Sequence, residues 1–302
     1  MHMTLNYFFF WLSVERLNGV GCVDIPIDVL EQLRSTDLEE YLDWLREYEF
    51  NGVRRTNTEG GIKRKLCSLR SLYTYLFNHD LIETNPTKKI DVPRIPEKEI
   101  VLLEKEEIVK FLDEVEYGEH LAGRLKAIHE KTKIRDLAIT TLLLATGIRV
   151  SELVGLNITD INFQLRKIRV RRKGGSEESV YFNREALHAL NDYWQERNRK
   201  FGISHEDKAL FLQSTGKRLS VRSVESLVEK YARFAFGEDF NKKICPHRLR
   251  ATYGTHLYDA SGDLFLTSEI LGHKDCNTTR KYYVRQSDLR KRMAADLVLL
   301  RE

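Results

Sequence analysis

Several polar side chains stand in segments that otherwise resemble buried core, and their types suit phosphate chemistry. His247 and Arg250 follow Pro246 at the expected start of a helix. Because they are three residues apart, they share one helical face. The unpaired backbone N–H groups of a helix N-terminus attract phosphate, so these two side chains could hold one. A capping histidine and a surface arginine would give the same pattern without a ligand.

A third candidate is an arginine between two apolar segments. Arg149 follows the apolar residues 144–148, in which Gly147 is suited to end a helix, and it begins the segment that carries Glu152. A guanidinium in such surroundings needs an anionic partner. That partner is either a phosphate or an acid of the chain itself, such as Glu152.

A tyrosine pair follows further along the chain. Tyr282 stands nine residues beyond His273, and Tyr283 adjoins it. The commoner fate of a tyrosine is core packing with a satisfied hydroxyl. A phenol, with a pKa of about 10, is a poor nucleophile unless its charge is stabilised. Two arginines beside it would favour the phenolate and the extra charge of a five-coordinate phosphorus.

Taken together, the order of these residues and the short motifs that contain them resemble those of the tyrosine recombinase (phage integrase) family. The matching strings are Ala-Thr-Gly-Ile-Arg-Val-Ser-Glu-Leu at 145–153, Arg-Lys-Gly-Gly at 172–175, Pro-His-Arg-Leu-Arg at 246–250, Leu-Gly-His at 271–273 and the tyrosine at 282. The likeness covers nearly the whole chain and looks closest to the Xer-like recombinases of bacteria, the Firmicute type in particular. It implies a site-specific DNA recombinase that cuts and rejoins strands through a 3′-phosphotyrosine intermediate.

The resemblance assigns three residues to the scissile phosphate. Arg149 and Arg250 would clamp it with their planar donor forks, which match phosphate oxygens. His273 would hydrogen-bond the phosphate and help to position it. Glu152 matches a recurrent acid of the family that supports the fold or the site.

The same resemblance assigns three residues to bond making and proton transfer. Tyr282 would attack, Lys173 would act as general acid for the leaving 5′ oxygen, and His247 would assist proton transfer. The nine-residue step favours Tyr282 over Tyr283 as the nucleophile. Many relatives have a histidine where this chain has Ala251, from which we expect a packing difference alone. No cofactor is expected, because two arginines and a lysine supply the charge without a metal ion and a covalent link makes ATP unnecessary.

Three basic clusters indicate where DNA would be held. They lie at residues 54–70, 166–173 and 280–292. Local density of this kind neutralises phosphates even though the net charge is only +4. Solvated faces balanced by acids elsewhere are the alternative. The expected DNA contacts are Arg54, Arg55, Lys63, Arg64, Lys65, Arg171 and Arg172.

The elements that must position these residues are mostly helices. Apolar periodicity predicts helices over 37–48, 62–77, 104–115 and 135–146, then over 184–199, 221–235, 247–260, 264–271 and 286–300. Alternation predicts two strands, 167–172 and 178–182, joined at Gly174-Gly175. The expected fold class is mainly α with a small antiparallel β-sheet.

Prolines at 93 and 96 predict an extended hinge at about 91–97. We therefore expect two domains. Residues 1–94 would be a helical core-binding domain that contacts DNA, and residues 95–302 a catalytic domain that ends in a C-terminal helix. Together they would form the two-domain clamp of a tyrosine recombinase around the duplex. The opening Met-His-Met is consistent with a cloning remnant, in which case the natural chain starts upstream.

Composition excludes some classes of protein. With 302 residues, 42% hydrophobic and 31% charged, the chain has enough apolar material for two cores and is not a disorder composition. The apolar run 7–12 is too short to cross a bilayer, and the four cysteines show no pairing by spacing. We expect a cytoplasmic protein with reduced thiols and no membrane partner.

The expected partners are double-stranded DNA with a specific recombination site and, on that DNA, three further copies in a homotetramer. Free in solution we expect a monomer. The C-terminal helix carries an apolar stripe at helical spacing, which would dock on a neighbouring subunit or, alternatively, on its own core: Leu289, Met293, Leu297 and Leu300. The leading biological role is chromosome dimer resolution, followed by integration and excision of a mobile element.

Three rival interpretations remain open. A zinc site could use Cys245, His247, His273 and Cys276, although their spacing is not a common zinc pattern. A catalytically silent DNA-binding accessory factor would have lost one of the six family residues, and all six are present. A type IB topoisomerase shares the tyrosine chemistry, but it relaxes supercoils alone instead of exchanging strands between paired sites.

Overall fold

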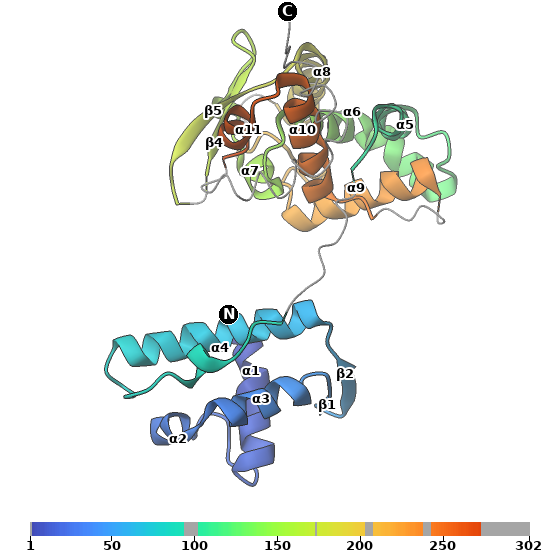
Figure 1. Ribbon diagram of the computed structural model, residues 1–302. Helices are drawn as coiled ribbons and strands as arrows, with labels where there is room; N and C mark the ends of the chain where they lie inside the picture. Colours follow the sequence, from blue (N-terminus) through green and yellow to red (C-terminus); the bar gives the residue numbers. More distant parts are fainter. Residues whose placement is uncertain (1, 94–101, 173, 203–207, 238–242, 273–302) are drawn as a thin grey trace, which may run out of the picture. The chain divides into compact units, whose positions relative to one another are not determined.

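The computed structural model of the protein describes residues 2–93, 102–172, 174–202, 208–237 and 243–272. The chain divides into two compact units, Met1–Lys98 and Glu99–Glu302, called here the N-terminal and the C-terminal unit (Figure 1). The described residues are mainly helical with two small antiparallel sheets. The expected fold class is therefore confirmed. The two-stranded sheet of the N-terminal unit was not predicted.

The N-terminal unit is a small helical bundle. Its long helix α4 buries Ile62, Leu66, Leu69, Tyr73 and Leu76, whose spacing of three or four residues forms one apolar face. This face packs with the aromatic side chains of α1 and α3 into one core. The helices are α1 (His2–Trp11), the π-helical turn η1 (Leu12–Arg16), α2 (Ile27–Gln32), α3 (Ser35–Trp44), α4 (Glu59–Asn78) and the 3-10 turn η2 (Pro86–Lys89).

A β-hairpin lies between α3 and α4, where the sequence predicted helix as far as residue 48. Helix α3 ends at Trp44, and β1 (Glu47–Phe50) then pairs with β2 (Val53–Thr56). Asn51 and Gly52 connect the strands with positive φ angles of 54° and 72°. An Asn-Gly pair adopts such angles readily and is a strong hairpin signal. The predicted end of the α3 helix was therefore wrong. The preference of Asn51-Gly52 for a hairpin turn prevailed over the helical spacing of the apolar residues before it.

The C-terminal unit is built around the helix α6, which packs against α5, α8 and α10. Residues 138–143 of α6 are all buried, as their apolar run predicted. The helix begins at Gly123, twelve residues before the predicted start, and ends at Gly147 with φ 60°. The helices of this unit are α5 (Lys105–Tyr117), α6 (Gly123–Thr146), α7 (Val150–Gly155), the 3-10 turn η3 (Ile158–Asp160), α8 (Arg184–Phe201), α9 (Val221–Phe236), α10 (Pro246–Ser261) and α11 (Leu264–Leu271).

A three-stranded antiparallel sheet lies beside α7 and α11 (Figure 1). Its order is β3 (Ile161–Asn162), β4 (Lys167–Arg171) and β5 (Glu177–Tyr181), with Ile168 opposite Val180 and Arg171 opposite Glu177. Ile168 and Val170 point into the core, and the alternating residues Arg169 and Arg171 point outward. Both predicted strands are confirmed to within one residue at each end.

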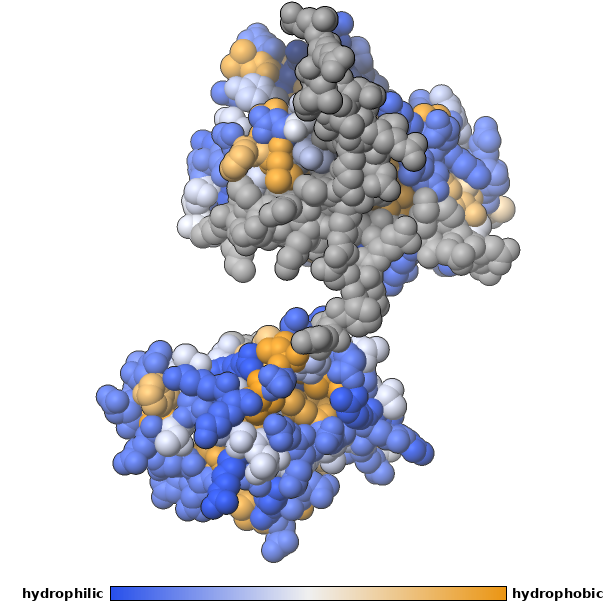
Figure 2. Space-filling model, in the orientation of Figure 1, coloured by the Kyte–Doolittle hydropathy of each residue, from blue (hydrophilic) through white to orange (hydrophobic). Residues whose placement is uncertain are grey.

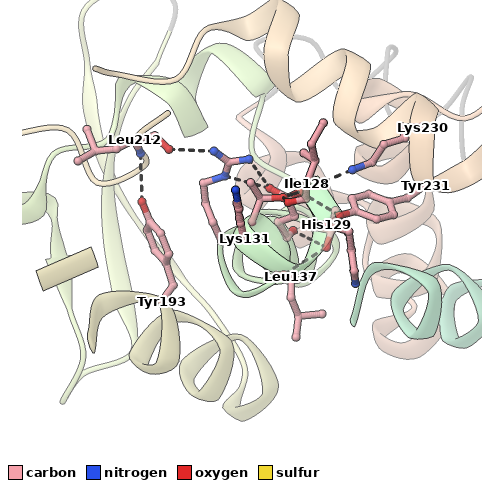
Figure 3. Close-up of polar contacts among 12 residues, drawn as sticks. Ile128, His129, Lys131, Leu137, Tyr193, Leu212, Lys230 and Tyr231 are labelled. Atoms are coloured by element: carbon pink, nitrogen blue, oxygen red, sulfur yellow. Dashed lines mark hydrogen bonds and ion pairs between the residues drawn. The ribbon is translucent and has the colours of Figure 1, made fainter. Parts of the chain in front are cut away.

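A buried polar network joins α6 to α9 (Figure 3). The Asp136 carboxylate accepts hydrogen bonds from Arg135 at 2.6 and 2.9 Å, from the Thr132 hydroxyl at 3.0 Å and from the Tyr231 hydroxyl at 3.0 Å. Nδ1 of His129 lies 3.0 Å from the same tyrosine hydroxyl. Because a buried carboxylate is costly unless it is paired, this network fixes the two helices against each other.

The surface seen in Figure 2 is mainly hydrophilic over the coloured residues of both units. Within the described ranges, no helix is long and apolar enough to cross a membrane.

Candidate active site

Three of the six predicted catalytic residues lie within the described part of the chain: Arg149, His247 and Arg250. Lys173, His273 and Tyr282 lie outside the described residues, as do Cys276 and the predicted C-terminal helix at 286–300. In the described part of the chain no group of three or more His, Cys, Asp or Glu side chains could hold a metal ion.

Arg250 projects from the first turns of α10 into the interior, where it is only 4% exposed. Its Nη1 donates to the carbonyl of Gly147 at 2.6 Å, and its Nη2 donates to the carbonyl of Leu271. These carbonyls belong to the C-terminal ends of α6 and α11, where helices leave acceptors without intrahelical partners. A cation is favoured at such ends, so Arg250 ties two helix termini together.

Arg149 is the residue just before α7, and its side chain is 35% exposed. Nη1 lies 2.8 Å from Oε1 of Glu152, and the backbone N–H of Arg149 donates to Oε2 of the same carboxylate at 2.8 Å. Nη2 donates to the carbonyl of Gly272 at 3.2 Å. The interpretation that Arg149 pairs with Glu152 is thus confirmed. It does not exclude phosphate binding, because the guanidinium still reaches solvent.

The C-terminal end of α11 is the point on which the arginines converge. Three consecutive carbonyls each accept a hydrogen bond from a different arginine: Ile270 from Arg172 at 2.9 Å, Leu271 from Arg250, and Gly272 from Arg149 at 3.2 Å. The donors come from the end of β4, from α10 and from the start of α7. Three arginines against the carboxylates of Glu152 and Glu178 leave a net positive charge at this helix end, which suits the charge of a phosphate.

Arg172 was expected on the surface as a DNA contact, and the structure places it elsewhere. Its side chain is 6% exposed overall and pairs with Glu152 at 3.1 Å and with Glu178 at 2.9 Å. The carboxylate of Glu152 therefore bridges Arg149 and Arg172. A buried arginine with these partners is not a direct phosphate contact. The alternation of β4 was a signal for this burial, because Arg172 follows Ile168 and Val170 in steps of two.

His247 stands at the second position of α10, where its side chain is exposed. The pKa of its imidazole is lowered below the usual 6.5, first by partial loss of water and then by the positive charges of Arg250, Arg248 and Arg149. The histidine is therefore neutral near neutral pH and able to accept a proton. Arg149 and Arg250 are thus near enough to His247 for their charges to act on its imidazole.

The basic residues of the N-terminal unit cluster around the hairpin and the start of α4. Arg54, Arg55 and Arg64 are exposed, whereas Lys63 and Lys65 are partly buried. Nζ of Lys65 donates to Asn57 at 2.6 Å, and its pKa is lowered by burial and by the nearby Arg64 and Arg55. Like charges this close together raise the local positive potential, which is the property that attracts a nucleic-acid backbone.

Comparison with known proteins places this geometry in a family. The profile of the phage integrase family matches residues 102–290. The tyrosine recombinase XerS of Streptococcus gordonii is 34% identical over an alignment of 304 residues, which covers 91% of this chain and 83% of the relative.

Two solved structures show the same fold. One is the XerH site-specific recombinase bound to palindromic difH substrate in a post-cleavage complex, with a TM-score of 0.68 and 23% identity over 88% of this chain and 72% of that chain. The other is the Tn1549 transposon integrase in complex with a circular intermediate DNA, with a TM-score of 0.68 and 21% identity over 89% of this chain and 87% of that chain. The chain therefore belongs to the phage integrase family and is a tyrosine recombinase, a site-specific enzyme that cleaves and rejoins DNA.

Proposed function

We propose that this recombinase attacks one DNA strand with Tyr282 and holds the scissile phosphate with Arg149 and Arg250. The observation that carries the proposal is the convergence of both arginines on the last carbonyls of α11. His247 shares this site and is neutral near neutral pH. Fixed cations at the reacting phosphorus stabilise the transition state without having to reorganise during the reaction.

The proposed step is an in-line transfer of the phosphoryl group. The phenolate oxygen of Tyr282 forms a bond to phosphorus, and the bond from phosphorus to the 5′ oxygen breaks. His247 takes the phenol proton, Lys173 gives a proton to the leaving 5′ oxygen, and His273 hydrogen-bonds the phosphate. The product is a 3′-phosphotyrosine and a free 5′ hydroxyl, and the reverse step seals the strand with no external energy.

The N-terminal unit would hold the duplex from its basic cluster, as a core-binding domain. Strand exchange between two duplexes needs four active sites, so we propose a homotetramer on DNA and a monomer in its absence. The XerS relatives favour a chromosomal site and hence chromosome dimer resolution, while the likeness to a transposon integrase extends to fold alone. Acting on a bacterial chromosome would place the protein in the cytoplasm.

The test is a covalent-trapping assay on a nicked duplex from which the product strand escapes. The duplex carries a site selected from random-sequence DNA by its binding to the full chain. We expect an adduct that survives denaturant and that Tyr282→Phe abolishes, while Tyr283→Phe keeps it. Loss with Tyr283→Phe alone would assign the nucleophile to Tyr283. A bound site that never gives an adduct would overturn the proposal in favour of a DNA-binding factor without catalysis.

A further inference from the structure

Arg172 directly follows β4, at a position where the alternation of the strand calls for an apolar side chain. Ile168 and Val170, four and two residues earlier, are 0% and 1% exposed, and Arg172 continues this inward row at 6%. Burying a guanidinium costs free energy unless its donors are paired. An aliphatic side chain would have filled the same position without that cost. The arginine therefore requires an explanation beyond packing.

The partners of Arg172 come from three different elements. Nε donates to Glu178 of β5 at 2.9 Å, Nη1 to Glu152 of α7 at 3.1 Å, and Nη2 to the carbonyl of Ile270 in α11 at 2.9 Å. A planar guanidinium with its donors in fixed directions holds such partners in one geometry. The side chain thus joins the tip of the β4–β5 hairpin to the two helices that carry the partners of Arg149.

The backbone of Arg172 also marks the start of the hairpin turn. Its N–H donates to the carbonyl of Ser176 at 2.8 Å, and its carbonyl accepts from the N–H of Gly175 at 3.0 Å. Both backbone polar groups of Arg172 are therefore hydrogen-bonded across the turn. The residue that follows in the sequence is Lys173, the proposed general acid.

We propose that Arg172 is a positioning residue that sets the general acid Lys173 against the phosphate held by Arg149 and Arg250. It acts by anchoring the start of the β4–β5 turn to Glu152 and to the end of α11. This inference rests on the proposed function, in particular on the role of Lys173. A misplacement of about 1 Å can lower a catalysed rate by about a hundredfold, so an anchor next to the acid has a large effect without touching the substrate.

The experiment compares two substrates that differ in one atom. Both are nicked duplexes with the selected site, and one of them has sulfur in place of the 5′ bridging oxygen at the scissile phosphate. A thiol has a pKa of about 8.5, far below that of an alcohol, so a thiolate leaves without a proton from a general acid. Cleavage of the sulfur substrate is thus insensitive to a missing or misplaced Lys173.

Arg172→Met and Arg172→Lys are expected to cleave the oxygen substrate about a hundredfold more slowly than the wild type and the sulfur substrate within a few-fold of it. Glu177→Gln is the matched control on the same hairpin, because its carboxylate is 40% exposed and pairs with Arg169 and Arg171 instead of Arg172, and it should cleave both substrates normally. Glu178→Gln loosens one contact of Arg172 and should give a smaller loss that sulfur also restores. If Arg172→Met does not fold, the Glu178→Gln variant tests the proposal in its place.

Lys173→Ala separates the inference from the function on which it rests. Lys173→Ala should cleave the oxygen substrate about 10²–10⁴-fold more slowly than the wild type, and sulfur at the leaving position should restore the rate. Sulfur should not restore the rate of Arg149→Ala. If sulfur restores Lys173→Ala but neither Arg172 variant, Arg172 acts through Glu152 on Arg149 or through stability, and the inference is overturned. Normal cleavage of the oxygen substrate by the Arg172 variants would also overturn it. If sulfur fails to restore Lys173→Ala, the proposed role of Lys173 fails and the inference with it.

Discussion

Glu152 and Arg172 form a buried ion pair in which Oε2 of the carboxylate lies 3.1 Å from Nη1 of the guanidinium. Each residue is 6% exposed, and the second oxygen of Glu152 holds Arg149. One carboxylate therefore bridges two arginines and offsets part of their charge, and this allows three guanidinium groups to gather at the end of α11. A cluster of cations that lacked this carboxylate would repel itself and lose the partner that orients Arg149.

The first prediction concerns the stability of this pair. Glu152→Ala should lower the free energy of unfolding by about 3 kcal/mol, because it leaves a buried guanidinium without its carboxylate. Adding Arg172→Met should cost less than the sum of the two single changes, with a coupling of about 1–3 kcal/mol in a double-mutant cycle measured by urea unfolding. The control cycle is Arg171–Glu177 on the same hairpin, an exposed pair whose coupling should be below about 1 kcal/mol. Equal coupling in both cycles would show that burial adds nothing.

The second prediction concerns the glycine that ends α11. Gly272 has a φ of 62°, and a Cβ there would lie 2.7 Å from Nε of Arg172. Gly262 ends α10 with a φ of 73°, and a Cβ at this position would meet nothing within 4 Å. Gly262→Ala should therefore cost about 1–2 kcal/mol through the left-handed backbone alone. Gly272→Ala should cost more and should also slow strand cleavage, because Arg172 has to move.

Urea unfolding of both variants and the trapping assay check this comparison. Equal losses of stability in the two variants, together with normal cleavage by Gly272→Ala, would mean that the side chain of Arg172 makes room for the added methyl group without cost. In that case the anchor at Arg172 tolerates displacement, and its proposed role would be weakened.

The elements that carry the site could largely be predicted from the sequence. The period of α4, the alternation of β4 and the apolar run of α6 each reflect a single face or side that meets the core, so local pattern was sufficient. The first half of α6 was missed because its residues are mostly polar and show no apolar period. The β1–β2 hairpin was missed although Asn51-Gly52 carried its signal.

The partners of the site residues could be predicted only in part. The pair Arg149–Glu152 follows from a spacing of three residues at a helix start, and the sequence offered it. The contacts of Arg172 with Ile270 and of Arg250 with Gly147 join residues about a hundred positions apart. No local pattern reports such contacts, and the basic run around Arg172 suggested exposure instead. Tertiary packing alone separates the inward arginine from its outward neighbours.

The third prediction is a pH dependence of stability that arises from His129. Burial, followed by the charge of Lys126, lowers the pKa of this histidine below its usual 6.5. The unfolded chain therefore binds a proton more readily than the folded one, and stability is lost as the pH falls below about 6.5. Above that pH the contribution is fully present. Urea unfolding at about pH 7.5 and about pH 5.5 should show a smaller pH effect in His129→Gln than in the wild type.

His247 also has a lowered pKa and contributes with the same sign, but it is present in both proteins, so their difference isolates His129. The control is His188→Gln, which removes an exposed histidine of α8 and should leave the pH effect as it is. An unchanged pH effect in His129→Gln would show that the Asp136 network accommodates a proton without loss of stability.

The last prediction tests the basic cluster of the N-terminal unit. Arg55 in strand β2 of the hairpin and Arg64 on α4 are exposed, and we expect each to contact a phosphate of bound DNA. Changing both to Gln should weaken binding to a labelled duplex and reduce the slope of log affinity against log salt by about 0.9 for each lost contact. Arg16→Gln is the control within the same unit, because Arg16 is already paired with Asp37 at 2.9 Å and Glu40 at 2.6 Å and should leave the slope unchanged. If the double variant keeps the wild-type slope, the cluster is a solvated face and the DNA is held by other residues.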